Sequence, residues 1–175
     1  MNEIIQAMET RRSIRKFKPD LPTRAQIDQI LEAGLYAASG RGSQGVITVA
    51  VTNPELRDRL SAINCKIGGW DVAFDPFYGA PVVLIVLADK NRPTCVYDGS
   101  LVMGNLMLAA HALGLGSCWI HRAKETFETE EFRRLLEELG IQGEYEGIGH
   151  CVVGYPAGDT PKAAERKDGR IFYVE

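Results

Sequence analysis

The stretch PVVLIVLAD, Pro81–Asp89, is the clearest buried strand in the sequence. Its apolar run has no polar residue before the final aspartate, whereas a strand with one solvent-facing side would alternate. Such an uninterrupted run is typical of a strand that is covered on both faces. The neighbouring segments are therefore expected to supply further strands and helices around it.

The segments before this strand predict a strand, a helix and an aromatic loop. Val46–Thr52 is rich in β-branched residues and alternates only partly, which indicates a largely buried strand. Asn53-Pro54 then opens a helix, because proline suits the first helical turn, and this helix fades near Lys66. Residues 68–79 carry several aromatic side chains and are expected to form an ordered loop or a short helix.

The segments after it begin with a long central helix. Asp98 can cap this helix, which continues to Leu113 and has apolar residues on more than one face. The sequence GLGS, 114–117, ends the helix and leads into a short strand at 118–121. The remaining expected elements are a charged-faced helix, a strand and an edge strand: 130–139, 149–154 and Ile171–Val174.

Two helices precede all of these elements. Ile4, Ile5 and Met8 fall at helical spacing and predict a short amphipathic helix. Thr23 and Gln26 have the spacing of a capping box that opens a second helix. Helices first, followed by strands mixed with helices, favour an α+β fold around a mixed sheet over a regular βαβ series.

The composition is that of an ordinary globular protein. The chain has 175 residues, of which 45% are hydrophobic and 25% charged, so residues 1–175 are expected to form a single domain. The net charge of −3 gives no general attraction to nucleic acid or to an anionic membrane. The sequence shows neither a signal-peptide pattern nor an apolar stretch long enough to span a bilayer. A cytoplasmic protein is implied.

The cysteines do not have the spacing of a metal site. They form no CxxC pair and no compact group with histidine, and they are expected to be reduced, buried thiols. These residues are Cys65, Cys95, Cys118 and Cys151.

A dense cationic cluster follows the first helix. Its charged members are Arg11, Arg12, Arg15, Lys16 and Lys18. If the segment is extended, some cations share one side while Ile14 or Phe17 anchors the segment to the core. Guanidinium groups with the Ser13 hydroxyl suit a phosphate, although a solvated basic loop is an equal interpretation.

Two further segments are candidates for ligand contacts. A second basic group in the tail either closes on the same anion or forms a solvated terminus, and consists of Lys162, Arg166, Lys167 and Arg170. Ser39–Gly45 is a plain connector, or it lets the backbone approach a flat polar ligand while Gln44 bonds to its edge. The sequence contains neither a GxGxxG motif after a strand nor a GxxxxGK[ST] motif, so the dinucleotide-binding fold and the P-loop have no support.

The run RRSIRKF at 11–17 resembles the RRSxRxF signature of FMN-dependent nitroreductases. The sequence also resembles this family at 38–44, 105–120 and 152–167, in the same order along the chain. The resemblance implies a nitroreductase-like fold, with a central, mainly antiparallel sheet flanked by helices. It also implies an intertwined homodimer that holds FMN non-covalently at the subunit interface.

The resemblance further implies which residues surround the cofactor. The phosphate and ribityl chain would be held by Arg11, Arg12, Ser13 and Arg15, with Arg166 or Lys167 completing the phosphate site. The isoalloxazine ring would be approached from the partner subunit by Ser39, Gly40 and Gln44. Beside the ring would lie Trp119, Ile120 and His121, where a backbone amide near His121 and Arg122 reaches N5. A donor there stabilises charge on the reduced flavin.

The sequence departs from the family pattern above the ring. Many relatives have proline where Trp119 stands and glycine where Arg122 stands, and Gly42, Gly45 and Val46 also differ. These positions shape the substrate space, so they affect the substrate range more than flavin binding. Since Trp119 and His121 also fit core and rim positions, His121 is assigned to the flavin environment and no side chain is assigned as catalytic.

The implied activity is an oxidoreductase with a ping-pong cycle. NAD(P)H would give a hydride to flavin N5, and an electron-poor acceptor such as a nitroaromatic, a quinone or a free flavin would then be reduced. An alternative is a flavin-binding or flavin-handling protein with little NAD(P)H turnover. A nucleic-acid arm at Arg11–Lys18 is a third interpretation, which the acidic charge balance disfavours.

Overall fold

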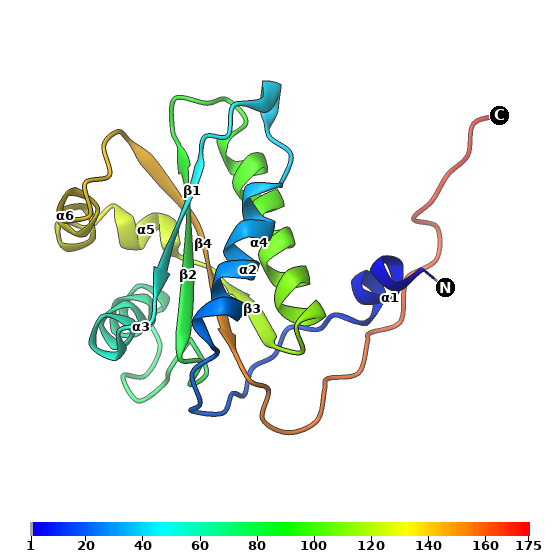
Figure 1. Ribbon diagram of the computed structural model, residues 1–175, viewed down its shortest axis with the longest axis horizontal. Helices are drawn as coiled ribbons and strands as arrows, with labels where there is room; N and C mark the ends of the chain where they lie inside the picture. Colours follow the sequence, from blue (N-terminus) through cyan, green and yellow to red (C-terminus); the bar gives the residue numbers. More distant parts are fainter. Residues whose placement is uncertain (1) are drawn as a thin grey trace.

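A four-stranded antiparallel sheet lies at the centre of the computed structural model, which describes residues 2–175. The strands lie in the order β1, β2, β4, β3, and their bounds are Val46–Val51, Val82–Asp89, Tyr145–Gly154 and Gly116–Ile120. Helices cover both faces of this sheet, as Figure 1 shows. The α+β expectation is confirmed.

Strand β2 is the buried strand that PVVLIVLAD predicts. It pairs with β1 on one side and with β4 on the other, and Val82–Ala88 is fully buried. Alternate residues enter two separate cores: Ile85 belongs to the core under α3, α5 and α6, and Leu84 belongs to the core under α2 and α4. Coverage on both faces explains why the strand carries no polar alternation.

Helices α2 (Arg24–Leu35) and α4 (Cys95–Ala112) cover one face. The capping box of Thr23 and Gln26 at the start of α2 is present as predicted. The prediction that Asp98 caps α4 is wrong, because the helix begins at Cys95 and encloses Asp98 in its first turn. The Asp98 carboxylate instead accepts hydrogen bonds from the Gly40 amide and the Thr94 hydroxyl.

Helices α3 (Pro54–Gly68), α5 (Ala123–Phe127) and α6 (Glu130–Glu138) cover the other face. Asn53 caps α3 by accepting a hydrogen bond from the Leu56 amide at 2.8 Å, so the predicted start is confirmed. Helix α5 was not expected from the sequence, because five residues are too few to show a helical period. It forms a turn that connects β3 to α6.

The sheet is more regular than the expected mixed sheet. The four strands pair antiparallel throughout, and in residues 2–175 the parallel pairing is an isolated bridge between Ser13 and Ser117. Strand β4 begins at Tyr145, several residues before the predicted strand at 149–154, and its register shifts opposite Val86 and Leu87. The bulge and the nearby glycines hide the strand pattern in the sequence.

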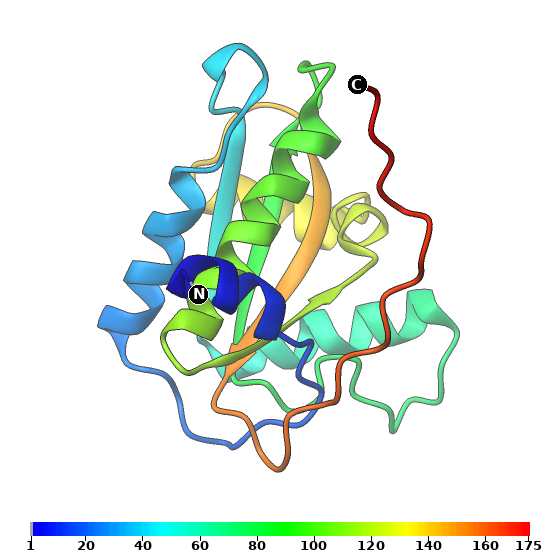
Figure 2. The same cartoon turned by 90° about the vertical axis from the view of Figure 1, so that its right-hand side faces the viewer.

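The predicted edge strand at Ile171–Val174 is absent from the sheet. These residues are exposed and form no strand, and the tail runs along the outside of the molecule (Figures 1 and 2). The edge of β3 is already occupied, since the Ile14 amide donates to the Ser117 carbonyl at 2.9 Å. The protomer therefore offers this apolar segment no partner along β3.

Helix α1 (Glu3–Thr10) lies across the C-terminal half of α4 in Figure 2. A short 3-10 turn, η1 (Gly40–Gly42), lies at the opposite end of α4. None of the helices described in residues 2–175 is long and apolar enough to cross a membrane.

Candidate functional site

The cationic segment after α1 is extended and attached to the sheet. Its backbone bonds to β3 through Ile14 and to the end of β4 through Lys18, whose amide donates to the Tyr155 carbonyl at 2.9 Å. Ile14 and Phe17 are both buried, which confirms the expected anchoring of the segment to the core. The arginines before and between them are held at the surface beside β3.

Three polar side chains of this segment gather near Cys118 on β3. Burial raises the pKa of the Cys118 thiol, whereas the charges of Arg15 and Arg11 and a hydrogen bond from Ser13 oppose that rise. The pKa of the His111 side chain is lowered by burial and by the charges of Arg11 and Arg12. Burial is the largest cause of both shifts, and the nearby arginine charges act on both groups.

Arg11 has a buried nitrogen, Nη1, without a hydrogen-bond partner. Across residues 2–175, no carboxylate lies within ion-pair distance of Arg11, Arg12 or Arg15. A buried guanidinium nitrogen is normally paired, because its desolvation is otherwise uncompensated. The cluster therefore has the donors and the charge for an anion such as a phosphate.

The other predicted phosphate ligands lie differently. Arg12 uses its Nη1 to donate to the Glu9 and Arg11 carbonyls, both at 2.7 Å. Arg166 and Lys167 lie in the exposed tail, where Arg166 donates to the nearby Ala164 carbonyl. Within the described chain, no hydrogen bond or ion pair joins these two tail residues to the segment at 11–15. The structure thus brings Arg11, Ser13 and Arg15 together, without the tail.

Ser39, Gly40 and Gln44 form a second group around η1. The Gly40 amide donates to Asp98 at 3.0 Å, and the Gln44 amide donates to the Ser39 hydroxyl at 3.0 Å. A Cβ atom on Gly40 would lie 2.4 Å from the Thr94 hydroxyl oxygen, so this close approach requires glycine. Gln44 is exposed and has a φ of 49°.

The two groups lie at opposite ends of α4. At the C-terminal end, the Thr10 hydroxyl lies 2.9 Å from Nε2 of His111, and at the N-terminal end Gly40 bonds to Asp98. Eighteen helical residues separate these ends by about 27 Å. Figure 2 shows the same separation between α1 and the η1 loop. Within one protomer the two groups do not meet.

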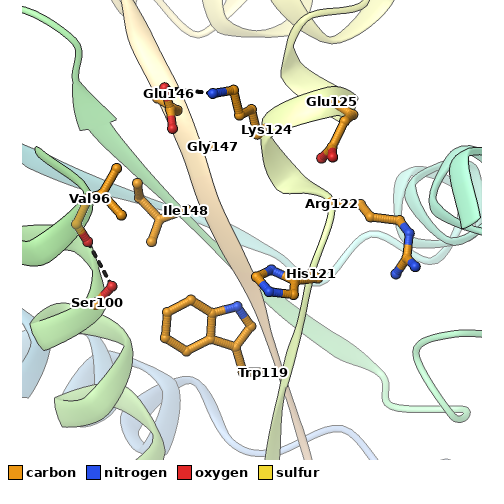
Figure 3. A pocket seen from close by; sticks show the side chains of 10 residues that line it. All are labelled: Val96, Ser100, Trp119, His121, Arg122, Lys124, Glu125, Glu146, Gly147 and Ile148. Atoms are coloured by element: carbon orange, nitrogen blue, oxygen red, sulfur yellow. Dashed lines mark hydrogen bonds and ion pairs between the residues drawn. The ribbon is translucent and has the colours of Figure 1, made fainter.

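An open pocket of about 770 Å³ lies beside the end of β3 (Figure 3). Val96 and Ser100 of α4 form one wall, and Trp119 and His121 form another. The ring centres of Trp119 and His121 lie 6.2 Å apart, in an edge-to-face arrangement. Lys124 and Glu146 pair across the rim at 3.4 Å. The pocket is wide enough for an aromatic substrate.

Trp119 is fixed tightly against the sheet. A Cβ atom on Gly149 would lie 2.5 Å from the indole Nε1, so the ring occupies the space that a side chain there would need. The Nε1 atom is buried and has no hydrogen-bond partner in the described chain. Trp119 therefore contributes an apolar surface to the pocket, and Ile120 points to the opposite core.

The backbone at His121 and Arg122 is held by residues that the sequence interpretation did not include. The Asn64 side chain donates from Nδ2 to the His121 carbonyl at 2.7 Å. Arg122 has a φ of 75°, and its guanidinium carbon lies 4.3 Å from the centre of the Trp70 ring. The signal available for Asn64 was its helical spacing of one turn from Leu60, which places it on the buried face of α3.

His150 was also not anticipated. It is fully buried on β4 and packs against Phe77, with ring centres 5.3 Å apart. Burial lowers the pKa of His150 to about 4, although the backbone of His121 and Ile120 opposes the shift. In the described residues, neither ring nitrogen has a hydrogen bond of good geometry, although the backbone of His121 and Ile120 lies close enough to favour the protonated form. No group of His, Cys, Asp and Glu in these residues is arranged to hold a metal.

The chain resembles known proteins over almost its whole length. A model described as "Nitroreductase family" matches residues 8–66 and 69–155. A NADPH-flavin oxidoreductase of Vibrio harveyi is 32% identical over 185 residues, covering 100% of this chain and 74% of that protein. An FMN reductase [NAD(P)H] of Bacillus subtilis is 26% identical over 184 residues, covering 93% of this chain and 69% of that protein. A crystal structure of a nitroreductase with bound FMN from Bacteroides fragilis superposes with a TM-score of 0.89 and 29% identity, covering all of both chains.

Proposed function

Because the chain belongs to the nitroreductase family, we propose that it binds FMN and passes electrons from NAD(P)H to an electron-poor small molecule. Proteins that it resembles are named as a flavin oxidoreductase and an FMN reductase, or contain FMN in their crystal structure. The free cysteines and the nicotinamide reductant fit a cytoplasmic location.

The observation that carries the proposal is the unpaired, buried nitrogen of Arg11 in a cluster without carboxylates. The phosphate of FMN supplies several acceptor oxygens and a negative charge, which this cluster lacks. Arg11, Ser13 and Arg15 would hold it from the protomer, and Arg12 would join after releasing its backbone contacts. Arg166 or Lys167 would reach the phosphate after movement of the tail.

The separation of the two groups supports a homodimer. One flavin that contacts both the Arg11 cluster and the η1 loop needs the loop of a second copy, since the length of α4 divides them. An apolar surface of the right kind covers α1, α2 and α4, and its exposed members include Ile4, Met8 and Tyr36. We propose that this surface pairs with a second copy in an intertwined dimer, which also covers the apolar tail.

The protein groups then have limited tasks. FMN held by these residues would supply the redox chemistry, a hydride transfer from NAD(P)H to an acceptor, and a ping-pong order is the one that we propose. In our proposal, a backbone amide near His121 and Arg122 would polarise the N5 edge of the ring. Trp119 and the pocket beside it would orient each substrate in turn, and nitroaromatics, quinones and flavins are the acceptors that we propose.

The first test is the visible spectrum of the purified protein, with the released cofactor identified by mass. We expect oxidised FMN, and oxidation of NADH or NADPH in the presence of a nitroaromatic or quinone. Colourless protein that does not bind added FMN would overturn the proposal. Yellow protein without turnover with either nicotinamide would restrict it to a flavin-binding role.

The second test removes the anion site. In Arg11→Ala/Arg15→Ala we expect the affinity for FMN to fall about 100-fold or more, since each charge-assisted bond to a phosphate contributes about 1.5 to 3 kcal/mol. Fluorescence titration with FMN measures the change. Arg24→Ala, which alters an exposed arginine paired with Asp28, is the control and should bind FMN normally. Unchanged FMN affinity in the double variant would remove the phosphate assignment.

A further inference from the structure

We infer that Asn64 is a positioning residue, which directs the backbone N–H of Arg122 out of the core and toward the pocket that would hold the flavin edge. This inference rests on the proposed function. It concerns a residue of α3 that lies behind the site and touches neither the cofactor nor a substrate.

The contact is buried and short. Asn64 is 0% exposed, and its Nδ2 donates to the His121 carbonyl oxygen at 2.7 Å. The other atom of the same amide, Oδ1, is buried without a hydrogen-bond partner. An apolar residue of the same size would avoid this desolvation cost, so the asparagine is not explained by core stability. What an apolar residue would not provide is the hydrogen bond that Asn64 donates to the His121 carbonyl.

The planarity of the peptide converts this contact into a direction. The His121 carbonyl and the Arg122 N–H belong to one peptide group, and the described chain has no cis peptide bond. In a trans peptide these two groups point in opposite directions. Asn64 pulls the carbonyl toward α3, which covers one face of the sheet, so the Arg122 N–H points toward the other face.

The other face is the side of the pocket. Trp119 packs in the core under α4, and it lines the pocket together with Val96 and Ser100 of that helix. In Figure 3 Arg122 follows His121 along the same backbone segment, and its side chain points away from Trp119. Within residues 2–175, no backbone or side-chain acceptor takes a hydrogen bond from the Arg122 N–H. The donor is therefore available to a ligand.

Two more contacts hold Arg122 in place. Its carbonyl accepts from the Thr126 amide at 3.0 Å and from the Thr126 hydroxyl at 2.7 Å, and its guanidinium stacks on Trp70. Both peptide groups that flank Arg122 are thus fixed from behind. The φ of 75° and ψ of 15° at Arg122 are uncommon for a residue with a side chain, and these contacts maintain them. The N–H is preorganised before any ligand arrives.

A fixed N–H dipole aimed at the ring favours the form of the flavin that carries more negative charge. Loss of Asn64 should therefore weaken binding of reduced FMN more than binding of oxidised FMN. We expect about a tenfold loss of this preference in Asn64→Leu, which corresponds to a fall of about 30 mV in the two-electron midpoint potential.

The experiment is spectroelectrochemical titration of FMN-loaded protein. Asn64→Leu keeps the branched shape of the side chain and removes the donor, at the cost of some added volume, and Asn64→Ala removes the donor without adding bulk if the leucine variant does not fold. Ser61→Ala is the matched control, because Ser61 lies on the same helix, is buried, and donates to Asp75 at 2.6 Å instead of to His121. We expect its potential to equal that of the wild type.

The outcomes separate the inference from the proposed function. A lower potential in both Asn64 variants, with the control unchanged, supports the positioning role. Wild-type potential in an Asn64 variant that binds FMN, or an equal fall in Ser61→Ala, overturns the positioning role and leaves the proposed function intact. Wild-type protein that binds no FMN overturns the proposed function itself.

Discussion

His150 combines complete burial with two ring nitrogens that have no partner in the described chain. Such a side chain is tolerated only while it is neutral, because a buried charge without compensation is costly. Its pKa of about 4 lies below the value of 6.5 for an unperturbed histidine. The unfolded chain therefore takes up the proton first as the pH falls.

This order gives a prediction about stability. The contribution of His150 is complete above about pH 6.5 and is lost as the pH falls toward 4, by roughly 3 kcal/mol in total. His150→Leu should lose less stability over this range than the wild type does. Urea unfolding at pH 7 and pH 5 measures the difference. If both proteins lose stability equally between these two values, the assignment to His150 is wrong.

Individual residues differ in how far their sequence context reveals them. The anchoring of the cationic segment was predictable in part, since Ile14 and Phe17 stand among the cations and are able to attach an extended segment to the core, although a solvated basic loop was an equal interpretation. Asn64 and His150 were not, because their importance depends on what faces them from another element. A single polar residue in an apolar pattern does not show its partner.

At the scale of elements, the junction between η1 and α4 is the part that the sequence interpretation placed wrongly. Asp98 has the residue type of a helix cap, but its carboxylate connects two elements through Gly40 and Thr94. The residue type alone predicted a cap, but the role of Asp98 is set by its contact with Gly40, 58 positions away in the chain. By contrast, β2 was predictable, because burial on both faces is recorded in its own residues.

The same junction provides a prediction. Asp98→Ala leaves the Gly40 amide and the Thr94 hydroxyl without their acceptor, so the free energy of unfolding should fall by roughly 2 kcal/mol or more. Asp28→Ala removes an exposed pair with Arg24 and should cost less than about 1 kcal/mol. Chemical denaturation of both variants tests this contrast. Equal stabilities would mean that the η1 loop is not held by Asp98.

At the scale of the whole molecule, the apolar surface of α1, α2 and α4 predicts the oligomeric state. We expect the wild-type protein to have twice the mass of one chain in light scattering at micromolar concentration. Ile4→Glu/Tyr36→Glu places charges in the proposed contact and should yield monomers with little bound FMN, because burial of an unpaired charge is unfavourable.

A control distinguishes this effect from a general loss of solubility or folding. Val72 is 97% exposed on the loop after α3, outside the apolar surface, so Val72→Glu should remain a dimer that binds FMN. A wild-type monomer that carries a full complement of FMN would contradict the dimer. The sequence indicated this association only through the family resemblance, since exposed apolar residues on a helix are identified by the fold.

The span of α4 between the two groups of ligand residues has a genetic consequence. In the proposed dimer each flavin takes its phosphate contacts from one chain and the contacts of the η1 loop from the other. If a chain defective at Arg11 and Arg15 is combined with a chain defective at Gly40, one composite site inherits both lesions and the other inherits neither. Two inactive proteins would then complement each other when co-expressed. In every mixed dimer, one of the two sites would be intact.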